Sequence, residues 1–284
     1  ADADDAHVGR REAGPAGVAV KTGDTAKAAG IVGRGGFGHG CFRASFEQQR
    51  GDILPLAGPL AGGHPAALAV DKAAGMVVHP AVGNWSGTFV NALLYHCKET
   101  PEAPPGSSPR DALRPGIVHR LDKDTSGVIV AAKTSFAQQK LIELFSGRQV
   151  YKEYLAICIG SPGEGAIDAP IGRHPVHRKM MAVVEEGGRH ALTHFRTLSA
   201  DEKLSLVSIV IATGRTHQIR VHMKHRGTPV LGDPVYGNVS FNGKMGTERQ
   251  MLHAYRLRFD HPVTGKPMEF TAEIPPDMQH VIKQ

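Results

Sequence analysis

Chemically active side chains are concentrated in one stretch near the middle of the chain, Arg114 to Gly127. It holds two carboxylates, Asp122 and Asp124, and carboxylates can act in acid–base or nucleophilic catalysis. Two acids this close suggest a glycoside hydrolase, but alternate side chains of an extended loop need not converge. Asp124 can equally stabilise a turn through the residues that follow it. We therefore take Asp122 as the candidate catalytic residue, with a loop-capping role as the alternative.

Buried elements are expected on both sides of this polar loop. Arg114-Pro-Gly116 should turn the chain, Ile117 and Val118 begin an apolar run, and residues 125–127 turn it again. Residues 128–132 then have the composition of a buried strand. A loop held by core segments at both ends can fix a side chain well enough for catalysis.

A second polar corner is predicted where a strand runs into a helix. Leu204 to Ile211 is the clearest strand pattern in the chain, and TGRTHQIRVHMK follows it at positions 213–224. Thr216 is the expected N-cap of the helix. A helix start combined with Arg215 and Arg220 favours the binding of an anion.

Other elements follow from apolar spacing, capping residues and turns. We expect strands at 68–72, 76–79, 151–159, 252–259 and 268–274, a helix capped by Thr88, and a helix from Thr134 or Ser135 to Gly147. Loops are expected at 99–109, 160–172 and 174–181, the last either solvated or in contact with phosphate. Pro275-Pro276 should end the ordered part.

The composition is that of a folded globular protein with a mild positive charge. Hydrophobic residues make up 41% of the 284 residues, and 33 Lys and Arg against 27 Asp and Glu give a net charge of +6. A polyanionic partner is compatible with this charge, and so is an ordinary basic surface. No apolar stretch approaches the roughly 20 residues that cross a bilayer, so no membrane span is expected.

The cysteines and histidines show neither a disulfide nor a metal-binding pattern. Cys41, Cys97 and Cys158 are far apart, which favours a reducing intracellular compartment. His222 and His225 form a close pair on an expected helix, but no carboxylate or thiol accompanies them, so no metal is expected. The cytoplasm is the predicted location, with a chloroplast or mitochondrion left open.

Four motifs, in this order along the chain, resemble the RluA class of RNA pseudouridine synthases. They are His119-Arg-Leu-Asp122 with residues 125–127, Lys152-Glu-Tyr154, Thr213 to His222, and Leu231-Gly-Asp-Pro-Val-Tyr236. The match runs from about Lys72 to Pro276, and the two longer motifs are far more specific than a lone signature. Family members usually have Lys-Pro where this chain has Lys72-Ala73.

The resemblance implies an α+β pseudouridine synthase catalytic domain. Its sheet is expected to be mixed, largely antiparallel and bent, with flanking helices and a central RNA-binding cleft. We place this domain at residues 65–277, between a poorly patterned, Gly- and Ala-rich extension at 1–64 and a C-terminal tail at 278–284. Many family members carry a small RNA-binding domain before the catalytic one, but the extension shows no matching pattern, so it is expected to be either a divergent, disordered extension or a damaged reading frame.

The resemblance also implies a reaction, the isomerisation of uridines in RNA without a cofactor, with ribosomal RNA favoured over transfer RNA. By motif position, Asp122 is the essential carboxylate, Arg220 its basic partner and Tyr154 the pocket tyrosine. Contacts with the substrate are expected from His119, Arg120, Arg215, His217 and Lys224. The expected protein is a monomer that binds a structured RNA loop with a flipped-out uridine. The alternative is a noncatalytic RNA-binding or ribosome-assembly protein that retains the fold.

Overall fold

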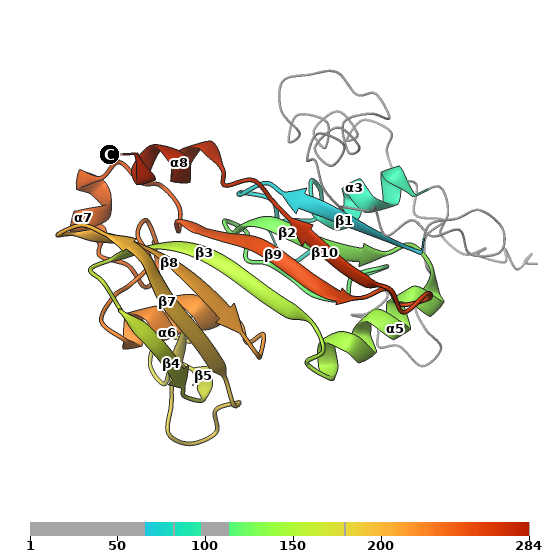
Figure 1. Cartoon of the computed structure of the whole chain (residues 1–284), viewed down its shortest axis with the longest axis horizontal. Helices are drawn as coiled ribbons and strands as arrows, with labels where there is room; N and C mark the ends of the chain where they lie inside the picture. Colours follow the sequence, from blue (N-terminus) through green and yellow to red (C-terminus); the bar gives the residue numbers. More distant parts are fainter. Residues whose placement is uncertain (1–65, 82, 98–113, 179, 284) are drawn as a thin grey trace, which may run out of the picture.

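The computed structural model describes residues 66–81, 83–97, 114–178 and 180–283 (Figure 1). The predictions for residues 1–64 and for the loop at 99–109 lie outside the described residues. The described part is an α+β fold in which a large, mostly antiparallel sheet carries a few short helices (Figure 1). The predicted fold class is therefore confirmed.

Ten strands and five helices are found within the described residues. The strands are β1 (Ala67–Lys72), β2 (Ser126–Ala132), β3 (Tyr151–Ile159), β4 (Glu164–Asp168), β5 (Ile171–Arg173), β6 (Met181–Val183), β7 (Leu192–Ala200), β8 (Leu204–Ile211), β9 (Leu252–Asp260) and β10 (Pro267–Thr271). The helices are α3 (Phe89–His96), α5 (Ser135–Ser146), α6 (Gln218–His225), α7 (Val239–Lys244) and α8 (Pro276–Ile282).

Most of the predicted elements are present. The strands β3 and β8 occupy the predicted residues, Thr88 caps α3, and α5 lies between its N-cap Thr134 and its C-cap Gly147. Besides the start of α6, which is described with the site, three predictions are wrong. Residues 76–79 form no strand, and the connection at 160–172 contains β4 and the start of β5. The third concerns the C-terminal segment.

Pro276 begins a helix instead of ending the ordered part. The ring of proline fixes φ at a helical value, and its missing N–H costs nothing in the first turn of a helix, where that group has no partner. Met278 of α8 is fully buried. The segment predicted as a C-terminal tail is therefore helical up to Ile282 and contributes to the core.

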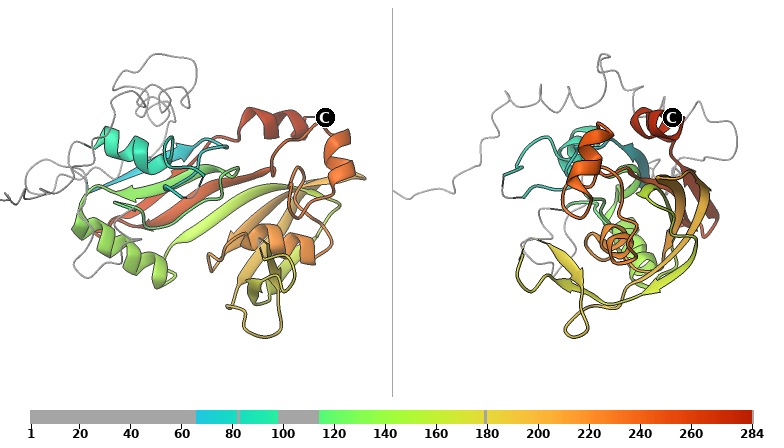
Figure 2. Two further views of the ribbon diagram at one scale, coloured as in Figure 1. Left: turned by 180° about the vertical axis from the view of Figure 1, so that it is seen from behind. Right: turned by 90° about the vertical axis from the view of Figure 1, so that its left-hand side faces the viewer.

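One eight-stranded sheet runs through the described part in the order β1-β2-β9-β3-β8-β7-β4, with β10 paired to β9. Its strands are antiparallel except β2 and β9, which run parallel over two residue pairs at Ser126 and Gly127. The strands β5 and β6 form a separate two-stranded sheet. Figure 2 shows that the large sheet is bent. The polar loop thus enters the sheet directly beside β9.

Gly127 allows β2 to approach β9 at this entry point. Its φ of +110° lies in a region that side chains disfavour, and a Cβ atom there would overlap the backbone of Ala254 on β9. Any other residue would push the two strands apart where the polar loop ends.

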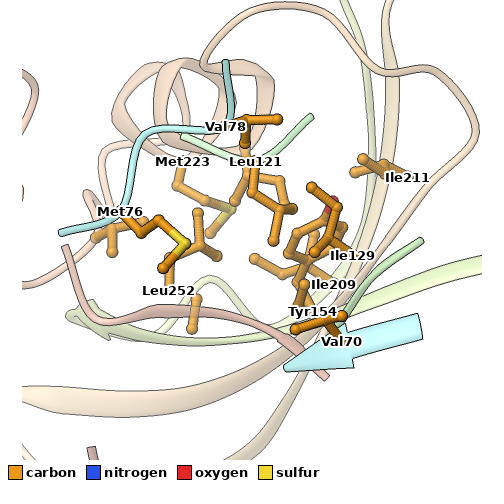
Figure 3. Packing of buried hydrophobic residues seen from close by; sticks show 14 of the residues in the cluster. Val70, Met76, Val78, Leu121, Ile129, Tyr154, Ile209, Ile211, Met223 and Leu252 are labelled. Carbon is orange, nitrogen blue, oxygen red and sulfur yellow. The ribbon is translucent and has the colours of Figure 1, made fainter. Parts of the chain in front are cut away.

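Both faces of β2 are covered, which explains its uninterrupted apolar run. Val128 and Val130 belong to the cluster that includes Leu141 of α5, whereas Ile129 belongs to the cluster on the other face. Alternate residues of a strand point to opposite faces, and because both faces are covered here, every side chain from Val128 to Ala132 is apolar. Figure 3 shows the second cluster, with Tyr154 among aliphatic side chains.

His253 joins β9 to β2 below the polar loop. Its Nε2 donates to the carbonyl of Ala272 at 3.4 Å, and its Nδ1 lies 2.9 Å from Ser126 Oγ. In the neutral ring, Nδ1 accepts the hydroxyl hydrogen of Ser126. The side chain is fully buried, and burial lowers its pKa to about 4.

We expect acid to destabilise the fold through His253. As the pH falls from about 6.5 to about 4, the unfolded chain binds a proton at this residue that the folded chain does not. The stability linked to His253 is therefore present above pH 6.5 and is lost through this window, by roughly 3 kcal/mol in total. The His253→Gln variant keeps a donor and an acceptor but does not titrate. Urea unfolding near neutral pH and near the acid end of the window should show a weaker pH dependence for this variant, and an unchanged dependence would contradict the prediction.

Candidate active site

A small pocket lies between the polar loop and the start of α6. Its volume is about 90 Å³, and it is lined by residues of the polar loop, β3, the turn after β8, α6 and β9. Asp122, Tyr154 and Arg220 all contribute to its wall, and Ile211 and Leu252 add apolar surface. The pocket therefore combines a charged group with surfaces that suit a flat ring.

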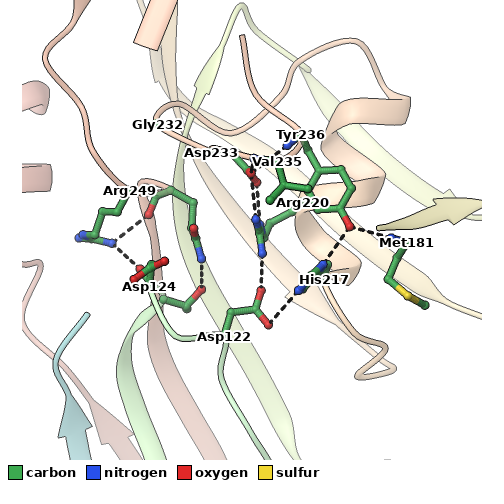
Figure 4. A network of polar contacts seen from close by, with 12 residues as sticks. Asp122, Asp124, Met181, His217, Arg220, Gly232, Asp233, Val235, Tyr236 and Arg249 are labelled. Atoms are coloured by element: carbon green, nitrogen blue, oxygen red, sulfur yellow. Dashed lines mark hydrogen bonds and ion pairs between the residues drawn. The ribbon is translucent and has the colours of Figure 1, made fainter. Parts of the chain in front are cut away.

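Arg220 holds Asp122 through a direct ion pair (Figure 4). Its Nη1 donates to Asp122 Oδ2 at 3.0 Å, while Nε and Nη2 donate to Asp233 at 2.6 and 2.9 Å. Burial opposes the charge of the guanidinium, but the hydrogen bonds and charges of the two carboxylates outweigh it and raise the pKa of Arg220. A charged guanidinium in this position fixes the rotamer of Asp122 and leaves its Oδ1 available to a substrate.

Asp233 anchors the guanidinium from the other side. It is fully buried, and its Oδ1 also accepts hydrogen bonds from the backbone N–H groups of Val235 and Tyr236 at 2.8 and 2.9 Å. In the sequence, residues 231–236 are recognised only as one of the four motifs, and this second carboxylate is not among the predicted site residues. Asp233 is the only acidic residue of the motif Leu231-Gly-Asp-Pro-Val-Tyr236, and this is the signal that could have identified it.

The backbone of the polar loop is held at three successive carbonyl groups. Thr125 N donates to Asp122 O at 3.2 Å, Lys72 Nζ to Lys123 O at 3.0 Å, and Arg249 Nη1 to Asp124 O at 3.1 Å. The Lys72 side chain is buried, which lowers its pKa to about 8, and two more carbonyls accept from its Nζ. Arg249 is bound in turn by Asp277 at 2.6 and 2.8 Å, so the loop is tied to α8.

Tyr154 forms one side of the pocket from β3. Its side chain is 9% exposed, and burial, together with the nearby charge of Asp122, raises the pKa of the hydroxyl. The phenol is therefore not ionised near neutral pH. Its ring is the part of the residue that can act, as a flat surface for a base.

The family model described as RNA pseudouridylate synthase matches residues 66–225. The chain belongs to this family. The resemblance seen in the four motifs is thus confirmed, and so is the assignment of the chain to the RNA pseudouridine synthases as a class of enzyme.

Curated relatives match most of the chain. It is 47% identical to the ribosomal large subunit pseudouridine synthase D of Zymomonas mobilis, over 76% of this chain and 69% of that protein. Identity to the protein of the same name from Neisseria meningitidis is 46%, over 76% of this chain and 58% of that protein. The solved structure of Human RNA Pseudouridylate Synthase Domain Containing 1 gives a TM-score of 0.58 at 27% identity, over 76% of this chain and 83% of that one. The chain thus spans 58% to 69% of the length of these two curated relatives.

Three of the five residues predicted to contact the substrate line the pocket. Arg120 is exposed at its edge, and Arg215 donates through Nε to the carbonyl of His190 at 2.9 Å. His217 lies beside Asp122, with its Nε2 3.9 Å from Asp122 Oδ1. The two guanidinium groups can meet phosphates at the mouth of the pocket.

The other two predicted contacts, His119 and Lys224, are not brought into the pocket. His119 Nε2 accepts from the backbone N–H of Val130 at 2.9 Å, its ring stacks on Phe145 with centroids 4.5 Å apart, and burial lowers its pKa to about 3. It therefore joins the loop to β2 and α5 and does not face the substrate site. Lys224 is exposed on α6 outside the pocket lining, so RNA could reach it only beyond the pocket.

The start of α6 differs from the prediction. The N-cap is His217, in the left-handed conformation with φ 57°, and not Thr216. Gln218 Oε1 accepts from Thr213 Oγ1 at 2.7 Å and from Arg215 N at 3.0 Å, so a side chain from inside the helix closes the turn. This turn places the ring of His217 in the pocket.

Neither a metal cluster nor a membrane helix is found in the described part of the chain. Within those residues, no group of three or more His, Cys, Asp or Glu could hold a metal ion, and no helix is long and apolar enough to cross a membrane. Cys97 and Cys158 are buried free thiols, and Cys41 lies outside the described residues.

Proposed function

We propose that the protein converts specific uridines of ribosomal RNA to pseudouridine. Family membership supports the reaction class, and two relatives are named as ribosomal large subunit enzymes. One observation carries the proposal. Arg220 holds one oxygen of Asp122 at 3.0 Å in a pocket that also contains the ring of Tyr154, and the second oxygen remains available to the sugar.

The proposed reaction exchanges one bond of the nucleotide for another and changes no atom count. The bond from the sugar C1′ to N1 of the base breaks, the base turns, a bond from C1′ to C5 forms, and C5 loses a proton while N1 gains one. Breaking the glycosidic bond develops positive charge on the sugar, which the Asp122 carboxylate can stabilise or capture covalently. Alternatively, Asp122 removes a proton from the neighbouring sugar carbon. Both routes use the Asp122 carboxylate that Arg220 holds at 3.0 Å.

The target uridine has to leave its stack to bring its sugar against Asp122 inside the pocket. Extruding a nucleotide costs a few kcal/mol and favours loops or distorted helices, so we propose a structured loop as the substrate. Arg120 and Arg215 at the pocket mouth are suited to its phosphates. We also propose that the protein acts as a monomer inside the cell.

Mapping pseudouridines in cellular RNA with and without the gene tests this function. We expect one or a few ribosomal RNA sites to disappear and to return with the intact gene, but not with a gene that carries Asp122→Asn. Loss of sites in transfer RNA alone would overturn the substrate class. An unchanged map would favour a noncatalytic RNA-binding protein.

A further inference from the structure

His217 lies beside the catalytic carboxylate with its two ring nitrogens in different surroundings (Figure 4). Its Nδ1 is 2.8 Å from the hydroxyl oxygen of Tyr236, and its Nε2 is 3.9 Å from Asp122 Oδ1. The side chain is 22% exposed, so one edge of the ring is open to the pocket.

Tyr236 determines which nitrogen of His217 carries the hydrogen. The Tyr236 hydroxyl is buried and accepts from the backbone N–H of Met181 on β6 at 2.9 Å. A buried phenol needs an acceptor for its own hydrogen, and His217 Nδ1 is at the right distance. With Nδ1 as the acceptor, the hydrogen of the neutral imidazole is on Nε2, on the side of Asp122.

The surroundings of His217 favour the neutral ring. Burial lowers its pKa, and the charges of Arg220 and Arg120 act in the same direction, whereas Asp122 and Asp233 oppose them. A neutral ring with its hydrogen on Nε2 is a hydrogen-bond donor without a full charge.

Asp122 and His217 thus present an acceptor and a donor side by side. Asp122 Oδ2 is occupied by Arg220, so the oxygen that faces His217 is Oδ1. A separation of 3.9 Å is too long for a hydrogen bond between Oδ1 and Nε2, but one oxygen atom can lie about 2.8 Å from both. The group that satisfies both is a hydroxyl, because it donates to the carboxylate and accepts from the imidazole.

We propose that Asp122 Oδ1 and His217 Nε2 together bind the ribose 2′-hydroxyl of the target nucleotide, so that His217 selects ribose over deoxyribose. The 2′-hydroxyl is both donor and acceptor, and it distinguishes RNA from DNA at a given nucleotide. Tyr236 acts as a positioning residue, because it fixes the tautomer of His217. The inference rests on the proposed function, since it names the part of the substrate that the same pocket recognises.

The test compares two RNA oligonucleotides that differ only at the target position, uridine in one and 2′-deoxyuridine in the other. The efficiency of a single turnover is measured for each RNA with the full chain. If the deoxyuridine RNA forms no product, its inhibition constant is measured instead of a rate. We expect His217→Asn to reduce the preference for ribose about tenfold, mainly through a loss on the uridine RNA. Asparagine tolerates the left-handed backbone, and its amide is too short to reach the hydroxyl.

Two matched variants separate recognition from structure. Tyr236→Phe keeps the ring of residue 236 but removes the hydroxyl, so His217 can adopt either tautomer. This variant should lower the ribose preference by a smaller factor than His217→Asn. His194→Leu alters an exposed histidine of β7 away from the pocket and should leave the preference unchanged. An equal loss on both RNAs with His217→Asn, or no loss on either, would overturn the inference. Absence of product from uridine RNA with the unaltered protein would instead count against the proposed function, and the inhibition constants would still compare ribose with deoxyribose.

Discussion

Replacing Asp122 with Asn is expected to abolish pseudouridine formation while RNA affinity stays within about twofold. The amide has the shape of the carboxylate but not its charge, so it can neither stabilise a positive sugar nor attack it. Loss of an essential catalytic carboxylate typically costs about 10⁴-fold or more in rate. Arg220 keeps its partner Asp233, so the fold should persist. Tritium release from carbon 5 of uridine measures the reaction, and filter binding measures the affinity.

Asp124→Asn is the matched control for this experiment. Asp124 lies two residues away, but the group of this residue that holds the loop is its backbone carbonyl, which accepts from Arg249. The substitution leaves that carbonyl in place, so most of the activity should remain. Turnover by Asp122→Asn above about one hundredth of the normal rate would contradict the assignment. An equal loss from both variants would instead favour a site that depends on two carboxylates.

The strands that carry the site could be predicted because their signals are local. Tyr151 to Ile159 alternates toward an apolar end and matches β3, and the run from Leu204 to Ile211 matches β8. The start of α6 could not be predicted in the same way. Thr216 is a residue type that commonly caps a helix, but here the side chain of Gln218 accepts the hydrogen bonds of the turn. Which residue closes the turn depends on how the turn packs against β7.

The composition of the site was only partly predictable, because its decisive contacts join distant segments. Asp122 and Arg220 are 98 residues apart, and only the resemblance of the motifs paired them. Lys72 shows most clearly which contacts cannot be predicted from the sequence. A lysine at the end of a strand usually lies in water, yet here it is buried because three carbonyls of folded loops converge on its Nζ. No local pattern in the sequence signals such a convergence.

Arg220→Lys is expected to lower both stability and turnover, although it keeps the charge. One ammonium group cannot reproduce the fork with which Arg220 binds Asp233 through Nε and Nη2 and Asp122 through Nη1. The buried carboxylate of Asp233 then loses part of the hydrogen bonding that compensates for the burial of its charge. This loss should lower the free energy of unfolding, measured by urea denaturation, by about 3 kcal/mol. Asp122 also loses the contact that fixes its rotamer, so kcat should fall by about 10²-fold.

The division between kcat and KM shows whether Arg220 positions the carboxylate or binds RNA. Arg220 is buried behind Asp122, with only 5% of its side chain exposed, so the KM for RNA should change little. Asp233→Asn provides the comparison, because it weakens the anchor of Arg220 but leaves the ion pair with Asp122 in place. It should lower stability to a similar extent and kcat much less. If Arg220→Lys retained a normal kcat, or if its loss appeared only in KM, Arg220 could not be the residue that orients Asp122 for catalysis.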